Sequence, residues 1–502
     1  MKKRVSEIIT IEDVKKWNEG EIITIAAGTG AGKSYFVKNI LYAFAKANDK
    51  KILFLIHRTN CVNQFQKEIE RDEKTDTIHI KTYQFIETKI KNNKAIDFSE
   101  YQYIVCDEFH YFMSDASFNK TTDISLNTIL NENNKIRIFM SATGEHVQKY
   151  INNIKKMDTI NYKVPITYDF IKTLSFFNKN ETLEKFIEEC IEGTEKAIFF
   201  IESAQKAYDL YKKYEKYCLF NCSKSNKKYY QYVNKDKINN MLENEKFEEQ
   251  ILITTTCMDA GVNIIDQDLL HIVCDVEDIG TLIQCIGRKR QQNKDDKIYL
   301  YIHNINNKQL GGKKTQINIK IKMAQYLRKH TVKEFIQEFQ REYDCSNIVY
   351  DDIVQEDNKS TKKINELMYF KCLIDKVIID NMIAASKKYG YTKYVRKLFN
   401  KKDSEVRILE ESYQKETLEE YLDKIAGKKL FKEEQKELIN MIDLKQDGKQ
   451  LKSFKSFNAC FDENKIPYMI ISKEDKRRKL ENGTINKNRG KTYWEVVKTI
   501  LE

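Results

Sequence analysis

Long apolar runs and paired cysteine clusters are both missing from this chain of 502 residues. No stretch approaches the roughly 20 apolar residues of a membrane span. The N-terminal segment has no apolar core followed by a small-residue cleavage site, so we expect a cytoplasmic protein that does not bind membranes. The 11 cysteines are scattered. Cys218 and Cys222 have no second Cys/His pair nearby, which argues against zinc and favours free thiols.

Proline is also rare, with 2 residues, whereas Lys, Asn and Ile are abundant. This usage is typical of an AT-rich genome, so part of the lysine excess carries no functional meaning. The formal net charge of +11 still favours a polyanionic partner. At this length one hydrophobic core is not enough, and we expect two to four domains.

The segment AAGTGAGKS lies between an apolar run over residues 22–27 and a helical pattern that begins at Tyr35. Strand, glycine-rich loop and helix in this order form the context of a phosphate-binding P-loop. We predict that Lys33 neutralises the β- and γ-phosphates of ATP and that Ser34 ligates Mg²⁺. The predicted nucleotide-binding residues of the loop are Ala27, Gly28, Thr29, Gly30, Ala31, Gly32, Lys33 and Ser34.

A second apolar strand, YQYIVCDEFHYF, ends in two adjacent carboxylates. In a nucleotide hydrolase the first, Asp107, would hold Mg²⁺, and the second, Glu108, would polarise the attacking water. A solvated acidic turn is the alternative. The position of the strand downstream of a P-loop favours the catalytic interpretation.

The segments AGTGAGKS, DEFH and SAT (residues 141–143) resemble motifs I, II and III of the superfamily 2 helicases. The DEFH form is similar to the DExH branch of the DEAD/DEAH-box helicases of bacteria and their phages. This resemblance implies an α/β fold of two tandem RecA-like domains with parallel sheets, with ATP in the cleft between them. It also implies that the SAT segment couples hydrolysis to movement on nucleic acid.

Motifs of a second domain follow in the expected order. KAIFFIESAQKAYDLY resembles motif IV, TTTCMDAGVNI resembles motif V, and QCIGRKR resembles motif VI with its last arginine one residue early. The resemblance implies that Gln284, Arg288 and Arg290 act on the γ-phosphate and that Gly261 contacts the nucleotide. Guanidinium groups suit the spread charge of that phosphate. A basic surface turn is the alternative.

Two further strand ends, in KKILFLIHRTN and IHIKTYQF, resemble motifs Ia and Ic. Short polar side chains and backbone N–H groups at such ends can hold backbone phosphates, which carry little sequence information. An ordinary strand-end turn is the alternative for each. The predicted nucleic-acid contacts are Arg58, Thr59, Thr82, Tyr83, Thr255 and Asn263.

Pro165 lies between the two motif sets and is typical of a connector. We predict a first RecA-like domain over residues 1–165, a second over 166–308, and a mainly helical accessory region over 309–502. The sequence GGKK at 311–314 predicts a hinge. At the end of the chain a helix, a strand, a basic loop and a strand resemble a winged-helix module, with a solvated hairpin as the alternative. The basic residues of that loop are Lys476, Arg477, Arg478, Lys487, Arg489 and Lys491.

These motifs together predict a DExH-like ATP hydrolase that moves along or unwinds nucleic acid, DNA rather than RNA, with ATP and Mg²⁺. Three alternatives stay open: an ATP-switched replication initiator or loader, a duplex translocase that does not separate strands, and an RNA helicase. Stimulation of ATP turnover by different nucleic acids distinguishes them.

Overall fold

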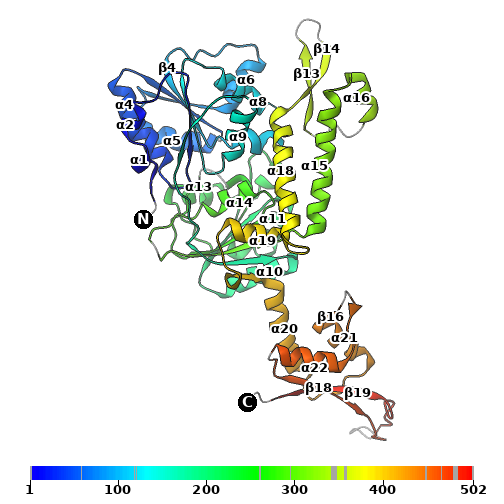
Figure 1. The fold of residues 1–502 in the computed structure, drawn as a ribbon. Helices are drawn as coiled ribbons and strands as arrows, with labels where there is room; N and C mark the ends of the chain where they lie inside the picture. The colour runs from blue at the N-terminus through cyan, green and yellow to red at the C-terminus, as the bar shows by residue number, and fades with distance from the viewer. Residues whose placement is uncertain are drawn as a thin grey trace. The chain divides into compact units, whose positions relative to one another are not determined.

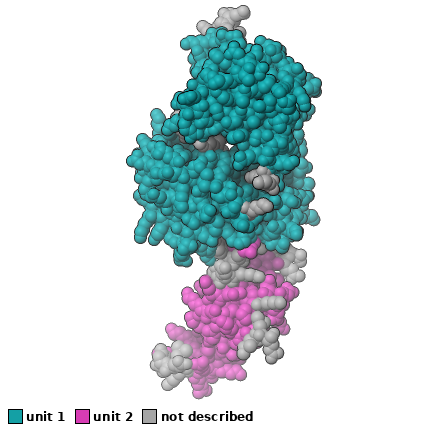
Figure 2. All heavy atoms as spheres, turned by 90° about the vertical axis from the view of Figure 1, so that its left-hand side faces the viewer, with its two compact units in different colours: residues 1–406 teal, residues 407–502 magenta. Residues whose placement is uncertain are grey.

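The computed structural model describes residues 3–57, 59–117, 119, 121–258, 262–293, 295–340, 347–354, 359–446, 449–464, 466–478 and 484–499. The chain divides into two compact units, residues 1–406 and 407–502, coloured teal and magenta in Figure 2. The boundaries at 165 and 308 stay a prediction. Among the described residues no helix combines the length and apolarity that a bilayer crossing requires.

The first sheet holds six parallel strands in the order β3-β2-β4-β5-β1-β6. Its central strands are apolar runs, as expected of a parallel sheet covered on both faces. Because β1, β5 and β4 are neighbours, the segments that follow them meet at one edge of the sheet. The strands are β1 (Ile22–Ala26), β2 (Lys51–Ile56), β3 (Ile78–Thr82), β4 (Tyr101–Asp107), β5 (Ile136–Ser141) and β6 (Ile160–Lys163).

The second sheet has seven strands in the order β15-β7-β12-β11-β8-β10-β9, and the pairs from β7 to β9 are parallel. Two parallel sheets with alternating helices confirm the predicted tandem RecA-like architecture. The strands are β7 (Ile171–Phe177), β8 (Lys196–Ile201), β9 (Cys218–Asn221), β10 (Ile251–Thr254), β11 (Leu269–Asp275), β12 (Ile298–His303) and β15 (Val406–Ile408).

Helices cover both faces of the first sheet, and each face has its own hydrophobic core. The helix after the P-loop passes through a π-helical turn, Phe36–Leu41, between α3 (Lys33–Tyr35) and α4 (Tyr42–Ala47). The other helices around this sheet are α1 (Val5–Ile8), α2 (Ile11–Val14), α5 (Thr59–Arg71), α6 (Tyr83–Lys91), α7 (Tyr111–Ser114), α8 (Thr122–Leu130) and α9 (Glu145–Asn153). Those of the second half are α10 (Asn180–Glu192), α11 (Ala204–Lys213), α12 (Lys227–Tyr230), α13 (Lys235–Asn244) and α14 (Ile279–Ile286).

A helical arm follows the second sheet, and its two long helices, α15 (Asn307–Leu327) and α18 (Glu366–Ala385), lie side by side (Figure 1). The predicted hinge at 311–314 is wrong, because these residues lie inside α15. Asn306 caps that helix by accepting a hydrogen bond from the Gln309 N–H, so the helix starts before the glycines. The arm also contains α16 (Val332–Glu338), the hairpin β13–β14 (Val349–Val354 and Lys359–Ile364) and α19 (Gly390–Leu398).

The second unit has its own core, which includes Leu422, Leu438, Phe457, Phe461 and Val496. Its last elements follow the predicted order of helix, strand, loop and strand. The unit consists of α20 (Leu409–Ile425), α21 (Lys432–Ile442), the short hairpin β16–β17 (Lys445–Gln446 and Lys449–Gln450), α22 (Phe454–Glu463), β18 (Tyr468–Glu474) and β19 (Thr492–Lys498).

Candidate active site

The P-loop leaves β1 and curls back on itself at two glycines in the left-handed region, Gly30 at φ 75° and Gly32 at φ 84°. Residues with a side chain rarely adopt this backbone conformation, so the glycines permit the curl. The Val5 N–H donates to the Ala31 carbonyl at 2.8 Å and fixes the loop from the N-terminal side. This hydrogen bond ties the loop to helix α1.

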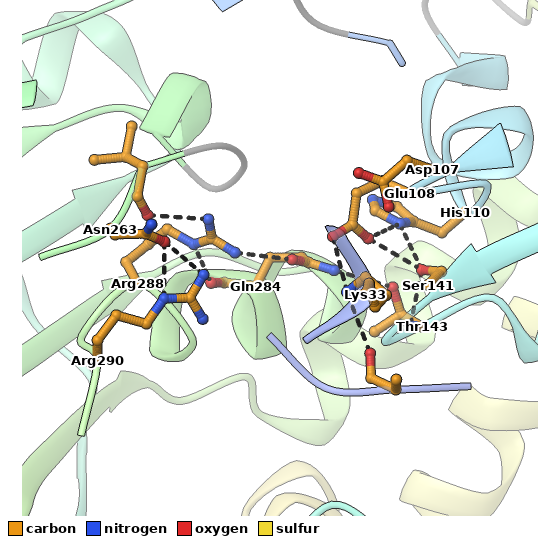
Figure 3. Close-up of polar contacts among 12 residues, drawn as sticks. Lys33, Asp107, Glu108, His110, Ser141, Thr143, Asn263, Gln284, Arg288 and Arg290 are labelled. Atoms are coloured by element: carbon orange, nitrogen blue, oxygen red, sulfur yellow. Dashed lines mark hydrogen bonds and ion pairs between the residues drawn. The ribbon is translucent and has the colours of Figure 1, made fainter. Parts of the chain in front are cut away.

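Lys33 points from the first turn of α3 into the space enclosed by the loop and is 7% exposed. Its Nζ lies 3.3 Å from the Ala27 carbonyl and 3.3 Å from Glu108 Oε1 (Figure 3). A buried ammonium needs negative partners, and here motif II supplies one. Motifs I and II, far apart in the sequence, therefore lie in contact with each other.

The two carboxylates at the end of β4 have opposite environments. Burial, followed by the charge of Glu108, raises the pKa of Asp107 to about 7. Burial also acts on Glu108, but Lys33 and His110 hold the pKa of Glu108 well below its usual range. Glu108 adopts φ 49°, an uncommon backbone conformation for a non-glycine residue.

Asp107 fits its predicted role as a magnesium ligand. Asp107 Oδ1 is buried and has no hydrogen-bond partner among the described residues. A buried carboxylate oxygen without a partner is costly, and a cation that accepts oxygen ligands would satisfy it. The Ser34 hydroxyl, one residue after Lys33, is the other oxygen that the prediction assigns to Mg²⁺, a cation that prefers oxygen ligands.

A chain of polar contacts leads from motif II across to the second sheet (Figure 3). His110 Nδ1 lies 3.3 Å from Glu108 Oε2 and 2.9 Å from Ser141 Oγ. The Thr143 N–H donates to Ser141 Oγ at 3.1 Å, and Gln284 Nε2 donates to Thr143 Oγ1 at 3.4 Å. Motif III therefore connects the Glu108 carboxylate to motif VI.

The two arginines of motif VI occupy different positions. Arg288 is 2% exposed and donates to the Gln284 and Val262 carbonyls at 3.0 and 3.1 Å, so it ties motif VI to motif V. Arg290 reaches the P-loop, because a Cβ built on Gly30 would lie 2.9 Å from Arg290 Nη1. Burial, followed by the charge of Arg288, lowers the pKa of Arg290 to about 10.

Asn263 lies in the same cleft, where its Oδ1 accepts hydrogen bonds from Arg290 Nε, at 2.8 Å, and from Arg290 Nη2. Its Nδ2 donates to Glu245 Oε1 at 3.1 Å. In this structure Asn263 orients an arginine, and its contact with nucleic acid stays a prediction. Gly261 lies outside the described residues.

The other predicted nucleic-acid contacts have varied surroundings. Arg58 and the side chain of Thr59 lie outside the described part of the chain. Thr82 Oγ1 caps α6 by accepting from the Phe85 N–H at 3.1 Å, and Thr255 is 7% exposed. Their contacts with nucleic acid stay predictions.

Tyr83 has no exposed surface, and its hydroxyl donates to the Asp107 carbonyl at 2.9 Å. A side chain without exposed surface cannot touch a strand, so the structure does not place Tyr83 where a nucleic-acid contact needs it. Its ring stacks on Tyr111 with centroids 5.0 Å apart. Tyr83 supports motif II from inside the domain.

Two residues of the site are absent from the predicted set. His110 is part of the DEFH segment, so its place in that motif could have identified it as a residue of the site. Glu245, at the end of α13, belongs to no recognised motif, and the sequence around it offers no sign of its contact with Asn263.

Residues 2–146 match the family model described as "Type III restriction enzyme, res subunit". No curated protein sequence matches the chain. Among solved structures, Mss116p bound to ssRNA and AMP-PNP is 15% identical, with a TM-score of 0.44 over 59% of this chain and 68% of that one.

Two further solved structures are similar to this chain at about the same level. The Type ISP restriction-modification enzyme LlaBIII bound to DNA is 15% identical, with a TM-score of 0.41 over 58% of this chain and 26% of that one. Mycobacterium smegmatis helicase Lhr bound to ssDNA and AMP-PNP is 13% identical, with a TM-score of 0.41 over 60% and 46%.

The family match covers the P-loop and motifs II and III, and residues of motifs V and VI lie next to them. The N-terminal part of the chain, residues 2–146, is therefore similar to this family of restriction-enzyme subunits, and the two parallel sheets carry the predicted motifs.

Proposed function

We propose that this protein hydrolyses ATP between its two RecA-like halves and uses the cycle to move along or unwind DNA. The observation that carries the proposal is the position of Arg290. It comes from motif VI of the second half, yet its guanidinium lies beside Gly30 in the P-loop of the first. In phosphoryl-transfer enzymes, an arginine that reaches the nucleotide from another part of the protein stabilises the charge on the transferring phosphoryl group.

Each residue of the cleft would have a separate role in ATP hydrolysis. The P-loop N–H groups and Lys33 would bind the β- and γ-phosphates, and Lys33 would exchange Glu108 for phosphate oxygens. Glu108, freed from that pair and kept ionised, would take the proton of the attacking water. Arg290 would place positive charge at the γ-phosphate. Ser34 and Asp107 would hold Mg²⁺, which neutralises phosphate charge when bound.

Movement would follow from the polar chain between the halves. The Gln284–Thr143 hydrogen bond crosses the cleft, so closure around ATP changes the surroundings of Ser141 and His110 directly. Contacts that exist only in the closed state couple ligand binding to domain closure. As the cleft closes and reopens, the two halves would bind and release the DNA strand in turn, and the protein would move along it.

DNA is the proposed polymer because the matched family is named for restriction enzymes and the chain is basic. The experiment is the steady-state ATPase rate at one fixed salt concentration, without nucleic acid and with single-stranded DNA, duplex DNA or RNA. Stimulation by single-stranded DNA supports the helicase, and stimulation by duplex DNA alone supports a translocase. Stimulation by RNA alone indicates an RNA helicase, and no stimulation by any polymer contradicts the proposal and favours an ATP switch.

A further inference from the structure

A basic loop joins β18 to β19 in the second unit. Every basic side chain of its described part is exposed, and residues 475–491 contain no aromatic side chain. Ile485 in the same loop is 79% exposed, the largest exposed fraction among the large hydrophobic side chains of the described residues. The exposed basic residues are Lys476, Arg477, Arg478, Lys487, Arg489 and Lys491.

The base of this loop is closed by a buried aspartate. Asp475 is 3% exposed, and its carboxylate pairs with Lys429 Nζ at 2.7 Å. Its N–H donates to the Lys491 carbonyl at 3.0 Å, and its carbonyl accepts from the Gly490 N–H at 2.7 Å. The backbone N–H and carbonyl of Asp475 therefore both bond to the other end of the loop, at Lys491 and Gly490.

A buried asparagine holds the two sides of the loop together. Asn486 is 5% exposed; its Nδ2 donates to the Arg477 carbonyl at 3.0 Å, and its N–H donates to the Arg478 carbonyl at 3.1 Å. Buried polar side chains with satisfied hydrogen bonds specify one conformation. The described parts of the loop, residues 475–478 and 484–491, are therefore held together by hydrogen bonds, which argues against a merely solvated hairpin.

The order of elements around the loop is that of a winged helix. After α20, Leu430 forms an antiparallel bridge with Trp494 of β19, with N–H···O distances of 2.8 and 2.9 Å. Then come α21, the short hairpin β16–β17, α22 and the hairpin β18–β19. Side chains of the three helices and of β18 and β19 share one hydrophobic core. The basic loop takes the position of the wing.

We propose that this wing binds double-stranded DNA through its phosphates, with Ile485 contacting the minor groove. Lysine and arginine side chains on a formed loop suit the phosphate backbone. Non-specific binding of single strands relies on aromatic stacking platforms, which this loop lacks. Exposed apolar side chains beside basic ones are typical of minor-groove binders.

The exposed face of α22 carries Lys455 together with Asp462 and Glu463. Acidic side chains would repel phosphates, so this helix adds little to the affinity. The wing should therefore bind duplexes of any sequence with similar affinity. This inference rests on residues 407–502 and does not depend on ATP hydrolysis.

The experiment is fluorescence anisotropy of a short blunt DNA duplex with the full-length protein, without ATP, over a range of salt concentrations. The test variant is Lys487→Ala with Arg489→Ala. The control removes two other exposed lysines of the same unit, Lys424→Ala with Lys432→Ala. We expect the test variant to bind roughly tenfold more weakly and to flatten the log–log salt slope by about 2.

In the control we expect Kd to change by less than about twofold. Ile485→Ser should weaken duplex binding without changing the salt slope, since no charge is lost. Circular dichroism melting curves check that each variant is folded. Duplex binding that is unchanged in the Lys487/Arg489 variant would overturn the proposal. So would tighter wing-dependent binding of single-stranded DNA or duplex RNA than of duplex DNA.

Discussion

Arg290 lies against Gly30, although one residue follows the second sheet's motif VI helix and the other belongs to the P-loop of the first sheet. The small glycine makes this approach feasible, because any side chain there would meet the guanidinium. Asn263 holds the same guanidinium from behind. The two halves of the chain are thus preformed for a shared site.

Replacing Lys33 by Ala should weaken ATP binding roughly 30-fold or more, because loss of one partner of a buried charge pair costs about 2 kcal/mol or more. Calorimetric titration with a non-hydrolysable ATP analogue measures this Kd. Lys46→Ala, an exposed lysine further along the same helical segment, serves as the control and should bind normally. Unchanged affinity in Lys33→Ala would contradict the assignment of the P-loop.

Glu108→Gln should leave ATP binding near normal and lower kcat roughly a hundredfold or more, the usual contribution of a general base. The amide keeps the shape of the carboxylate but cannot accept the proton of water. Steady-state phosphate release measures kcat. Glu100→Gln, before the opposite end of β4, is the matched control. Near-normal turnover in Glu108→Gln would rule out Glu108 as the base.

Gly287→Ala should impair closure of the cleft, because its Cβ would lie 1.9 Å from Thr29 Oγ1 of the P-loop. To relieve this clash, motif VI would have to move away from the P-loop, and a displacement of about 1 Å is expected to lower kcat on the order of a hundredfold. Thr29→Gly in the same protein should restore part of the loss by making room. If the double variant is no faster than Gly287→Ala alone, the contact does not limit closure.

Gly311→Ala should stabilise the protein by roughly 0.5–1 kcal/mol, since the residue lies inside α15 and nothing lies within 4 Å of its Cβ position. Chemical denaturation measures the free energy of unfolding. ATP turnover should stay unchanged. A loss of turnover with no gain in stability would instead indicate a hinge at this glycine.

The strands that precede the motifs could be predicted from the sequence, because buried strands appear in it as apolar runs. Each motif follows an apolar run, and a parallel strand covered on both faces must be such a run, so the strands before Asp107 and Ser141 could be predicted. The convergence of these motifs then follows from the strand order. The order of these motifs, through the family that they resemble, was enough to predict the fold class.

Other features depend on contacts between distant segments. The Gly311–Gly312 pair indicated a hinge, but a capped N-terminus and packing against α18 keep these residues helical. Tyr83 was expected at a surface, but its hydroxyl reaches the carbonyl of Asp107 inside the domain. The choice between Arg288 and Arg290 at the P-loop depends on side-chain direction, which spacing does not determine.

The central claim is that an arginine of the second half completes the ATP site of the first. Its most direct test is kcat for ATP hydrolysis by Arg290→Ala, with Arg71→Ala as a control for loss of an exposed arginine. We expect kcat to fall about a thousandfold or more in Arg290→Ala, at nearly unchanged KM, and to stay unchanged in Arg71→Ala. A kcat within about threefold of the wild-type value in Arg290→Ala would contradict it, since such a loss is worth under about 1 kcal/mol of transition-state stabilisation.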